Sequence, residues 1–287
     1  MTRIGAGVGT VFRRELATIA RTPGYGVLAV GLLLVLGGLI AAGGGGRTGF
    51  VPAVVDLLLP AEVLVPLFAV VVGYRALLSD TASGELAVIR TYPVSVTSYV
   101  VGVLLARMVA LLVVVVTPFA LLGLFIWLTA APDTGIFATH TGVDSPYLFV
   151  RFLVFIMLFG VAFLSLAAAV SAVASSRRSA VALAALTFVA GVVGGDLALL
   201  RALADGTSPS AIPVWLALTP NGAFRGLVFE YVIGAAFAPD GGIVDVRRAV
   251  GSLVGWTLVG IIVSVGTLAY RRRVDTLIER ARIHIGR

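Results

Sequence analysis

Cysteine and lysine are absent from this 287-residue chain, and histidine and methionine occur only two and three times. Without cysteine, the chain cannot form a disulfide, a thiolate zinc site, a cysteine nucleophile or an iron–sulfur cluster. So few histidines and methionines also exclude a chain of soft metal ligands.

Charge is scarce as well. Charged residues make up 12% of the chain, against about a quarter in soluble domains, and 59% of the residues are hydrophobic. A soluble protein could not hide so much apolar surface, and a disordered one would not contain it. The composition therefore predicts an all-α polytopic membrane protein, because helices satisfy their own backbone hydrogen bonds in lipid.

Six apolar stretches are each long enough for the roughly 20 residues that a bilayer core requires. They cover residues 25–42, 57–74, 99–130, 147–174, 180–200 and 249–270. With no internal repeat between them, we expect one transmembrane domain of six helices over residues 1–287.

The basic residues are all arginine, and they give the chain a net charge of +7. In a soluble protein this balance would suggest nucleic acid, but here the arginines lie between apolar runs and would set membrane orientation. With the N-terminus inside, the cytosolic segments hold 15 arginines and the external segments hold six. The pattern predicts a multi-pass protein of the cell membrane with both termini cytosolic, and no nucleic-acid partner.

Residues 8–21 have the pattern of an amphipathic helix. Val8, Phe12, Leu16 and Ile19 fall on one face, and Arg13, Arg14, Thr18 and Arg21 fall on the opposite face. Such a helix is expected to lie along the membrane surface. The alternative is an ordinary positively charged flank that happens to be helical.

The loop over residues 76–98 is predicted to be cytosolic and to contain a short helix from Ser83 to Arg90. Asp80 or Ser83 can cap this helix, Glu85 lies in its first turn, and Leu86 and Ile89 share a face. An ordinary turn is the alternative, but connections in helix bundles are usually about 2–8 residues long.

The region over residues 205–248 is predicted to be external. Its apolar run, 227–237, is too short to span a membrane and follows the breaker 219–222. A re-entrant or interfacial helix is therefore expected there. The tail 271–287 is expected to be a cytosolic amphipathic helix that continues the sixth span.

Catalytic groups are nearly missing. No GxxxxGK[ST] motif is present, so no P-loop is expected. His140 lies in a predicted external loop and His284 in the predicted cytosolic tail, so the two histidines cannot meet. The remaining candidates, which could line a substrate path, are Asp56, Glu62, Asp196 and Glu230. The alternative is that all four lie near an interface where water is close. Arg107 is expected to extend toward the headgroups.

Three segments carry a family resemblance: FRREL at residues 12–16, GYRALLSDTASGELAVIRTYP at 73–93, and TPNGAFRGL at 219–227. With the six spans, they resemble the permease subunits of ABC-2 type exporters, and most of all those of the nitrous-oxide-reductase maturation group. One departure is that 94–106 lacks the basic residue that relatives often carry after the loop proline.

The resemblance implies a separate ABC ATPase subunit that binds ATP and Mg²⁺, a second permease chain, and membrane lipid around both. This chain would bind no cofactor or metal of its own and would have no catalytic residues. By the same resemblance, Phe12, Arg13, Arg14 and Leu16 belong to a connecting elbow helix. Ser83, Gly84, Glu85, Leu86, Ile89 and Arg90 would couple the permease to the ATPase, and 211–240 would form an external re-entrant hairpin. An intramembrane enzyme and an assembly scaffold without transport activity are the alternatives.

Overall fold

The computed structural model describes residues 2–43, 47, 49–82, 94–129, 144–206, 208, 211–237 and 244–285, and every regular element in these ranges is a helix. The elements are α1 (Thr2–Ala20), α2 (Gly24–Ala42), α3 (Phe50–Gly73), α4 (Leu78–Ala82), α6 (Val96–Leu111), η1 (Leu112–Val116), α7 (Thr117–Thr129), α8 (Pro146–Val173), α9 (Arg177–Val189), η2 (Ala190–Gly194), α10 (Gly195–Ala204), α11 (Ile212–Leu218), α12 (Pro220–Val228), η4 (Phe229–Ile233), α13 (Gly234–Phe237) and α14 (Val246–Ile285).

Six of the described segments are long and apolar enough to cross a membrane, which confirms the predicted all-α fold with six spans. They are Gly24–Ala42, Phe50–Thr81, Val96–Thr129, Pro146–Val173, Arg177–Ala204 and Val246–Val274. The second span begins seven residues earlier than the stretch at 57–74, because α3 continues through the charged residue Asp56 to Phe50. The third span is long, as expected, and contains the π-helical turn η1.

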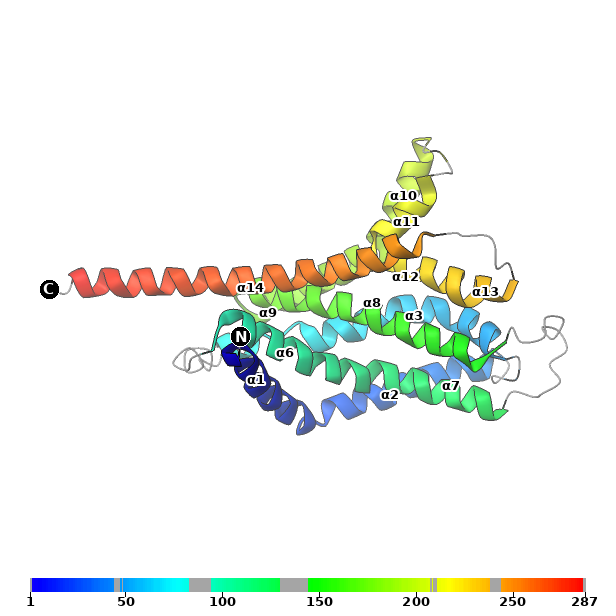
Figure 1. Ribbon diagram of the computed structural model, residues 1–287, viewed down its shortest axis with the longest axis horizontal. Helices are drawn as coiled ribbons and strands as arrows, with labels where there is room; N and C mark the ends of the chain where they lie inside the picture. Colours follow the sequence, from blue (N-terminus) through cyan, green and yellow to red (C-terminus); the bar gives the residue numbers. More distant parts are fainter. Residues whose placement is uncertain are drawn as a thin grey trace.

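The termini and the start of the 76–98 loop lie at one end of the bundle (Figure 1). α1 runs obliquely beside this end, and α14 extends beyond it to Ile285. The backbone of the tail thus continues the sixth helix, as predicted. α12 and α13 lie at the opposite end, while α10 and α11 project sideways from the bundle (Figure 1).

α8 is the central helix and packs mainly against α3 and α14. In its most apolar window 56% of the residues are buried, against 11% for the α9–α10 span and 17% for α2. Five fully buried phenylalanines, at positions 119, 152, 159, 163 and 224, fill the space around it. Phe159 stacks on Phe224 with ring centroids 4.5 Å apart, which anchors α12 against α8.

Gly260 allows α14 to approach α8. A Cβ atom at this position would lie 2.4 Å from the carbonyl carbon of Ser165, which is backbone and cannot turn aside. Gly266, also on α14, has nothing within 4 Å of its would-be Cβ. Close backbone approach through small residues is a usual way to pack helices in membranes.

Gly260→Ala should therefore lower the melting temperature of the purified protein, whereas Gly266→Ala should leave it unchanged or raise it. Overpacking costs about 1–3 kcal/mol, while alanine in place of an unconstrained helical glycine gains about 0.5–1 kcal/mol. Intrinsic fluorescence during heating measures both. Equal melting temperatures for the two variants would contradict the close contact between α14 and α8.

Candidate functional site: two polar clusters in the helix bundle

Arg225 of α12 joins two carboxylates from different spans. Its Nε and one terminal nitrogen donate to Glu62 of α3 at 2.7 and 2.6 Å, and its terminal nitrogens donate to Asp196 of α10 at 3.0 and 3.1 Å. We call Glu62, Asp196 and Arg225 the arginine cluster. Its geometry is the bidentate pairing that the planar guanidinium group favours.

Local chain breaks position this cluster. The Thr219 hydroxyl accepts from the Gly222 N–H, and Pro220 occupies the first turn of α12. The segment predicted as a breaker thus separates α11 from α12 and also starts α12. η2 ends two residues before Asp196, and η4 begins four residues after Arg225. π-helical turns of this kind are frequent at functional sites.

Polar side chains satisfy the carbonyl groups of these two turns. The Asn221 amide donates to the Val192 carbonyl of η2 at 3.2 Å, and Arg151 of α8 donates to the Tyr231 carbonyl of η4 at 3.1 Å. The cluster is therefore held from both sides by neighbouring helices.

The Glu62 carboxylate is the most buried part of the cluster. The Glu62 side chain is 4% exposed, and those of Arg225 and Asp196 are 28% and 35% exposed. Because α3 begins at Phe50, Glu62 lies about 18 Å along the helix from its start. Its carboxylate therefore contacts protein on most sides, and whether these acidic residues lie near a membrane interface stays a prediction.

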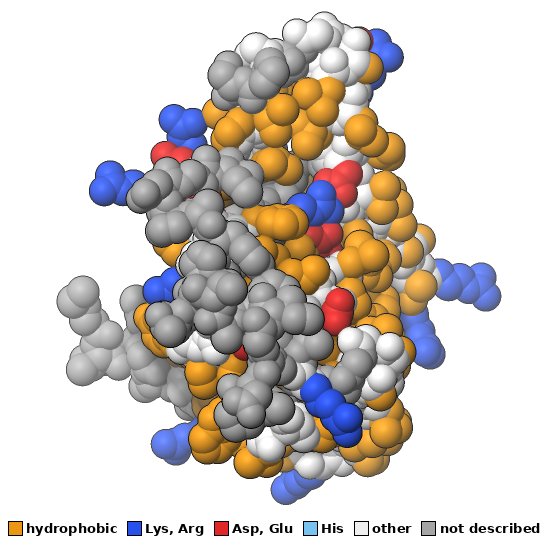
Figure 2. Space-filling model, turned by 90° about the vertical axis from the view of Figure 1, so that its right-hand side faces the viewer, with side chains coloured by type: hydrophobic (Ala, Val, Ile, Leu, Met, Phe, Trp, Pro, Cys, Tyr) orange, Lys and Arg blue, Asp and Glu red, His pale blue; other side chains and the backbone are white. Residues whose placement is uncertain are grey.

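The other two acidic candidates lie outside the cluster. Asp56 is exposed beside Gly43, and Glu230 is half-buried in η4. Figure 2 views the bundle from the α13 end and shows acidic and basic side chains next to each other, surrounded by hydrophobic ones. The structure thus brings Glu62 and Asp196 together through Arg225, which was not among the candidate residues.

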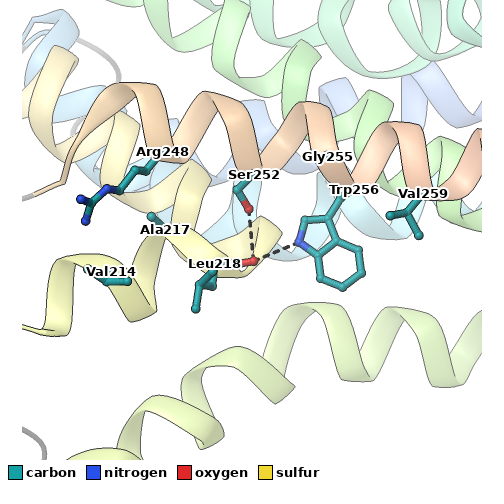
Figure 3. A pocket seen from close by; sticks show the side chains of 8 residues that line it. All are labelled: Val214, Ala217, Leu218, Arg248, Ser252, Gly255, Trp256 and Val259. Carbon is teal, nitrogen blue, oxygen red and sulfur yellow. Dashed lines mark hydrogen bonds between the residues drawn. The ribbon is translucent and has the colours of Figure 1, made fainter.

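α14 secures the end of α11 in a similar way. The Leu218 carbonyl, at the last residue of α11, accepts from Ser252 Oγ at 3.1 Å and from Trp256 Nε1 at 3.0 Å (Figure 3). These donors satisfy a carbonyl that the end of the helix leaves unpaired. The three residues line an apolar pocket of about 430 Å³ between α11 and α14.

A second polar cluster lies at the other end of the bundle. Asp80 of α4 accepts from Arg14 of α1 at 3.1 Å and from the Tyr99 hydroxyl of α6 at 2.9 Å. The Ser171 hydroxyl of α8 accepts from the backbone N–H groups of Leu77 and Leu78, both at 2.9 Å. The start of the 76–98 loop is therefore fastened to α1, α6 and α8. We call Arg14, Asp80, Tyr99 and Ser171 the loop anchor.

The loop anchor changes the role expected for Asp80. Asp80 lies within α4 and binds Arg14 and Tyr99, whereas the sequence suggested that it caps a helix beginning near Ser83. The predicted coupling residues Ser83, Gly84, Glu85, Leu86, Ile89 and Arg90 lie outside the described residues.

Arg107 differs from the expectation drawn from the sequence. Its guanidinium donates to Glu15 of α1 at 3.2 Å and to the Tyr25 hydroxyl, and its side chain is only 13% exposed. It is paired inside the protein and does not extend to the headgroups. Its carboxylate partner sets the orientation of α1.

Among residues 7–20, the part of α1 whose burial the structure describes, the most buried are Val11, Glu15 and Ile19. The predicted apolar face was 8, 12, 16 and 19, but only Ile19 of that set is fully buried. Phe12 and Leu16 are half-buried beside this face, Arg13 is exposed, and Arg14 reaches Asp80. The sequence pattern missed this face because a carboxylate occupies its centre.

Burial raises the pKa of Glu15, and this effect outweighs the opposing attraction of Arg107. The folded chain therefore holds the Glu15 proton more tightly than the unfolded chain. Stability should fall as pH rises from the unfolded value of about 4.5 through the raised pKa. Glu15→Gln, a neutral side chain of the same shape, removes this titration, so the stability of the parent relative to Glu15→Gln should be lower at pH 7.5 than at pH 5. Thermal unfolding of both proteins at both pH values measures this change, and a difference in stability that stays the same at the two pH values contradicts it.

Neither cluster resembles a metal site or a hydrolase. No group of three or more histidine, cysteine or acidic residues within the described ranges could hold a metal ion. Both clusters instead connect helices: the arginine cluster joins α3, α10 and α12, and the loop anchor joins α1, α4, α6 and α8.

Comparison with known proteins gives two matches. A family model described as "ABC-2 family transporter protein" matches residues 52–273. A protein of Pseudomonas aeruginosa named "Probable ABC transporter permease protein NosY" is 32% identical over 231 residues, which cover 76% of this chain and 80% of that protein.

Proposed function

Because the chain belongs to the ABC-2 family of transporter proteins and is the membrane subunit of a transporter, we propose that it couples ATP hydrolysis by a separate ATPase subunit to the export of a substrate. The observation that carries this proposal is the family match over residues 52–273. This range includes the whole arginine cluster and every residue of the loop anchor except Arg14 of α1. The family implies an ATPase partner, and ATP and Mg²⁺ would be bound by that partner.

The loop anchor supports a coupling role for residues 76–98. A force applied to this loop reaches α4 first, and Asp80 and Ser171 connect this segment to three other helices. A rigid connection of this kind moves its helices together, as in the shear and hinge motions of other proteins. The ATPase would then select one permease state through its differential contacts with the loop. The predicted helix from Ser83 to Arg90 is the segment that would bind the ATPase.

The export direction requires the α1 end of the bundle to face the cytosol. Thr139→Cys should therefore react with a membrane-impermeant thiol reagent in intact cells, while Thr91→Cys should react only after permeabilisation. The chain has no native cysteine, so each variant carries one reactive site. The physical reason is the arginine count, since positively charged loops remain inside. Reaction of Thr91→Cys alone in intact cells would invert the proposed orientation.

We also propose that two copies of the chain form the permease. α2, α9 and α10 leave most of their apolar side chains exposed. Lipid or a second copy would cover these surfaces, and a homodimer gives the ATPase subunits two equivalent loops. The mass of the purified complex in mild detergent tests this composition.

The proposed coupling is tested by purifying the tagged chain from its host and identifying by mass spectrometry a copurifying ATPase that carries GxxxxGK[ST].

Glu85→Arg should reduce the yield of that complex, because a like-charge contact at an interface costs several kcal/mol. Thr91→Ala is the matched control, since it lies in the same loop and changes no charge. A full yield of complex and unchanged hydrolysis with Glu85→Arg would remove the loop from the ATPase interface, and a chain that copurifies with no ATPase would overturn the proposed function.

A further inference from the structure

A second pocket, of about 590 Å³, lies where the chain turns from α1 into α2. The ends of α1, α2 and α3 form its walls, together with Arg107 of α6. The residues that matter here are Ile19, Tyr25, Val27, Val71, Arg75 and Arg107. Its volume falls in the range of about 300–1,000 Å³ that is usual for small-molecule sites.

The polar side of this pocket carries positive charge. Arg75 is exposed and makes no ion pair with any residue that the structure describes. Arg107 is paired with Glu15, but its buried Nε–H has no acceptor among the described residues. Because Glu15 offsets only one of the two arginines, the pocket has a net positive charge.

The other side is apolar and continuous with the outer surface of the bundle. Val27 of α2 and Val71 of α3 line the pocket, and they are also 70% and 41% exposed. Both belong to segments long and apolar enough to cross a membrane, so in a bilayer these exposed faces would contact acyl chains. The pocket thus joins a cationic site at the end of the spans to a surface that faces lipid.

We propose that this pocket binds one anionic phospholipid, with its phosphate held by Arg75 and its acyl chains lying along Val27 and Val71. Arginine suits phosphate because it presents several donors in one plane. A zwitterionic lipid would leave the net charge of the pocket uncompensated. A free phosphate would leave the apolar wall unused. The site depends on the chain being a membrane protein and is independent of the proposed coupling to an ATPase.

The test uses the purified chain in detergent, without any ATPase, and native mass spectrometry to count bound lipid. We expect one phosphatidylglycerol to be retained more tightly than phosphatidylcholine. Arg75→Gln should weaken phosphatidylglycerol binding about fivefold, the amount expected for one arginine at an anionic lipid surface. Arg13→Gln is the matched control, because Arg13 is exposed on α1 but does not line the pocket. It should change the binding less than twofold.

Two further measurements separate the lipid from its headgroup. Val27→Trp would fill the apolar side without altering charge, and it should also weaken phosphatidylglycerol binding. Glycerol phosphate should compete only weakly, because it lacks acyl chains. Equal retention of both lipids, equal effects of Arg75→Gln and Arg13→Gln, or displacement by glycerol phosphate at the same concentration as by phosphatidylglycerol would each overturn the proposal.

Discussion

Arg225→Met is expected to destabilise the protein by about 3–5 kcal/mol, the usual cost of removing one partner from a buried ion pair. The variant leaves Glu62, whose side chain is 4% exposed, without its bidentate donor, and Asp196 loses the same partner. An isolated carboxylate among apolar helices is costly in a protein and more so in a membrane. The yield of folded protein and its melting temperature in detergent measure the effect.

Two variants distinguish this pairing from a general effect of removing arginine. Glu62→Gln combined with Arg225→Met should recover most of the lost stability, because it removes the unpaired charge. Arg201→Met is the matched control, since Arg201 pairs with Asp205 on the same side of the molecule but both side chains are more than half exposed. Such a pair contributes about 0–1 kcal/mol. If Arg225→Met and Arg201→Met melt at the same temperature, the arginine cluster does not hold α12 to α3 and α10.

The spans could be predicted from sequence because a membrane helix depends on the local density of apolar residues. Each of the six predicted stretches overlaps a candidate span, and the second differs most, beginning at 57 in place of Phe50. The difference arises because Asp56 interrupts the apolar run in the sequence, whereas α3 continues through it to Phe50, with Val51 and Val54 buried in the bundle.

The polar clusters could not be predicted as clusters, because their members are far apart in the chain. Glu62 and Arg225 are 163 positions apart, and Arg14 and Asp80 are 66 apart. The sequence drew attention to Glu62 and Asp196 as single residues, since an acidic side chain in an apolar segment is rare. Arg225 lay in a short segment between breakers and gave no comparable signal. Glu62 and Asp196 both lie in apolar segments, and a carboxylate in such surroundings requires a cationic partner. This requirement could have directed attention to an arginine in another segment.

Asp80→Ala is expected to reduce the ATP hydrolysis that depends on the permease while leaving the complex with the ATPase intact. The variant removes the acceptor of the buried Tyr99 hydroxyl and of Arg14, so the start of the loop loses its connection to α6 and α1. A buried donor left without an acceptor costs about 1–3 kcal/mol, which corresponds to a change of roughly 5- to 150-fold in the population of the connected state. The substitution leaves residues 83–90, the segment proposed to bind the ATPase, unchanged, so complex yield should remain normal.

Tyr99→Phe and Arg14→Gln divide this effect between the two contacts. The Tyr99 hydroxyl donates to Asp80 within the protein, while the Arg14 side chain is 36% exposed and its ion pair is screened by solvent. We therefore expect Tyr99→Phe to reduce permease-dependent hydrolysis more than Arg14→Gln does. In the double variant Asp80→Ala with Tyr99→Phe, the buried hydroxyl is no longer present, so its loss should add little to that of Asp80→Ala alone. Additive losses in the double variant would mean that the two residues act separately, and Asp80 would then transmit motion from the loop through some contact other than α6.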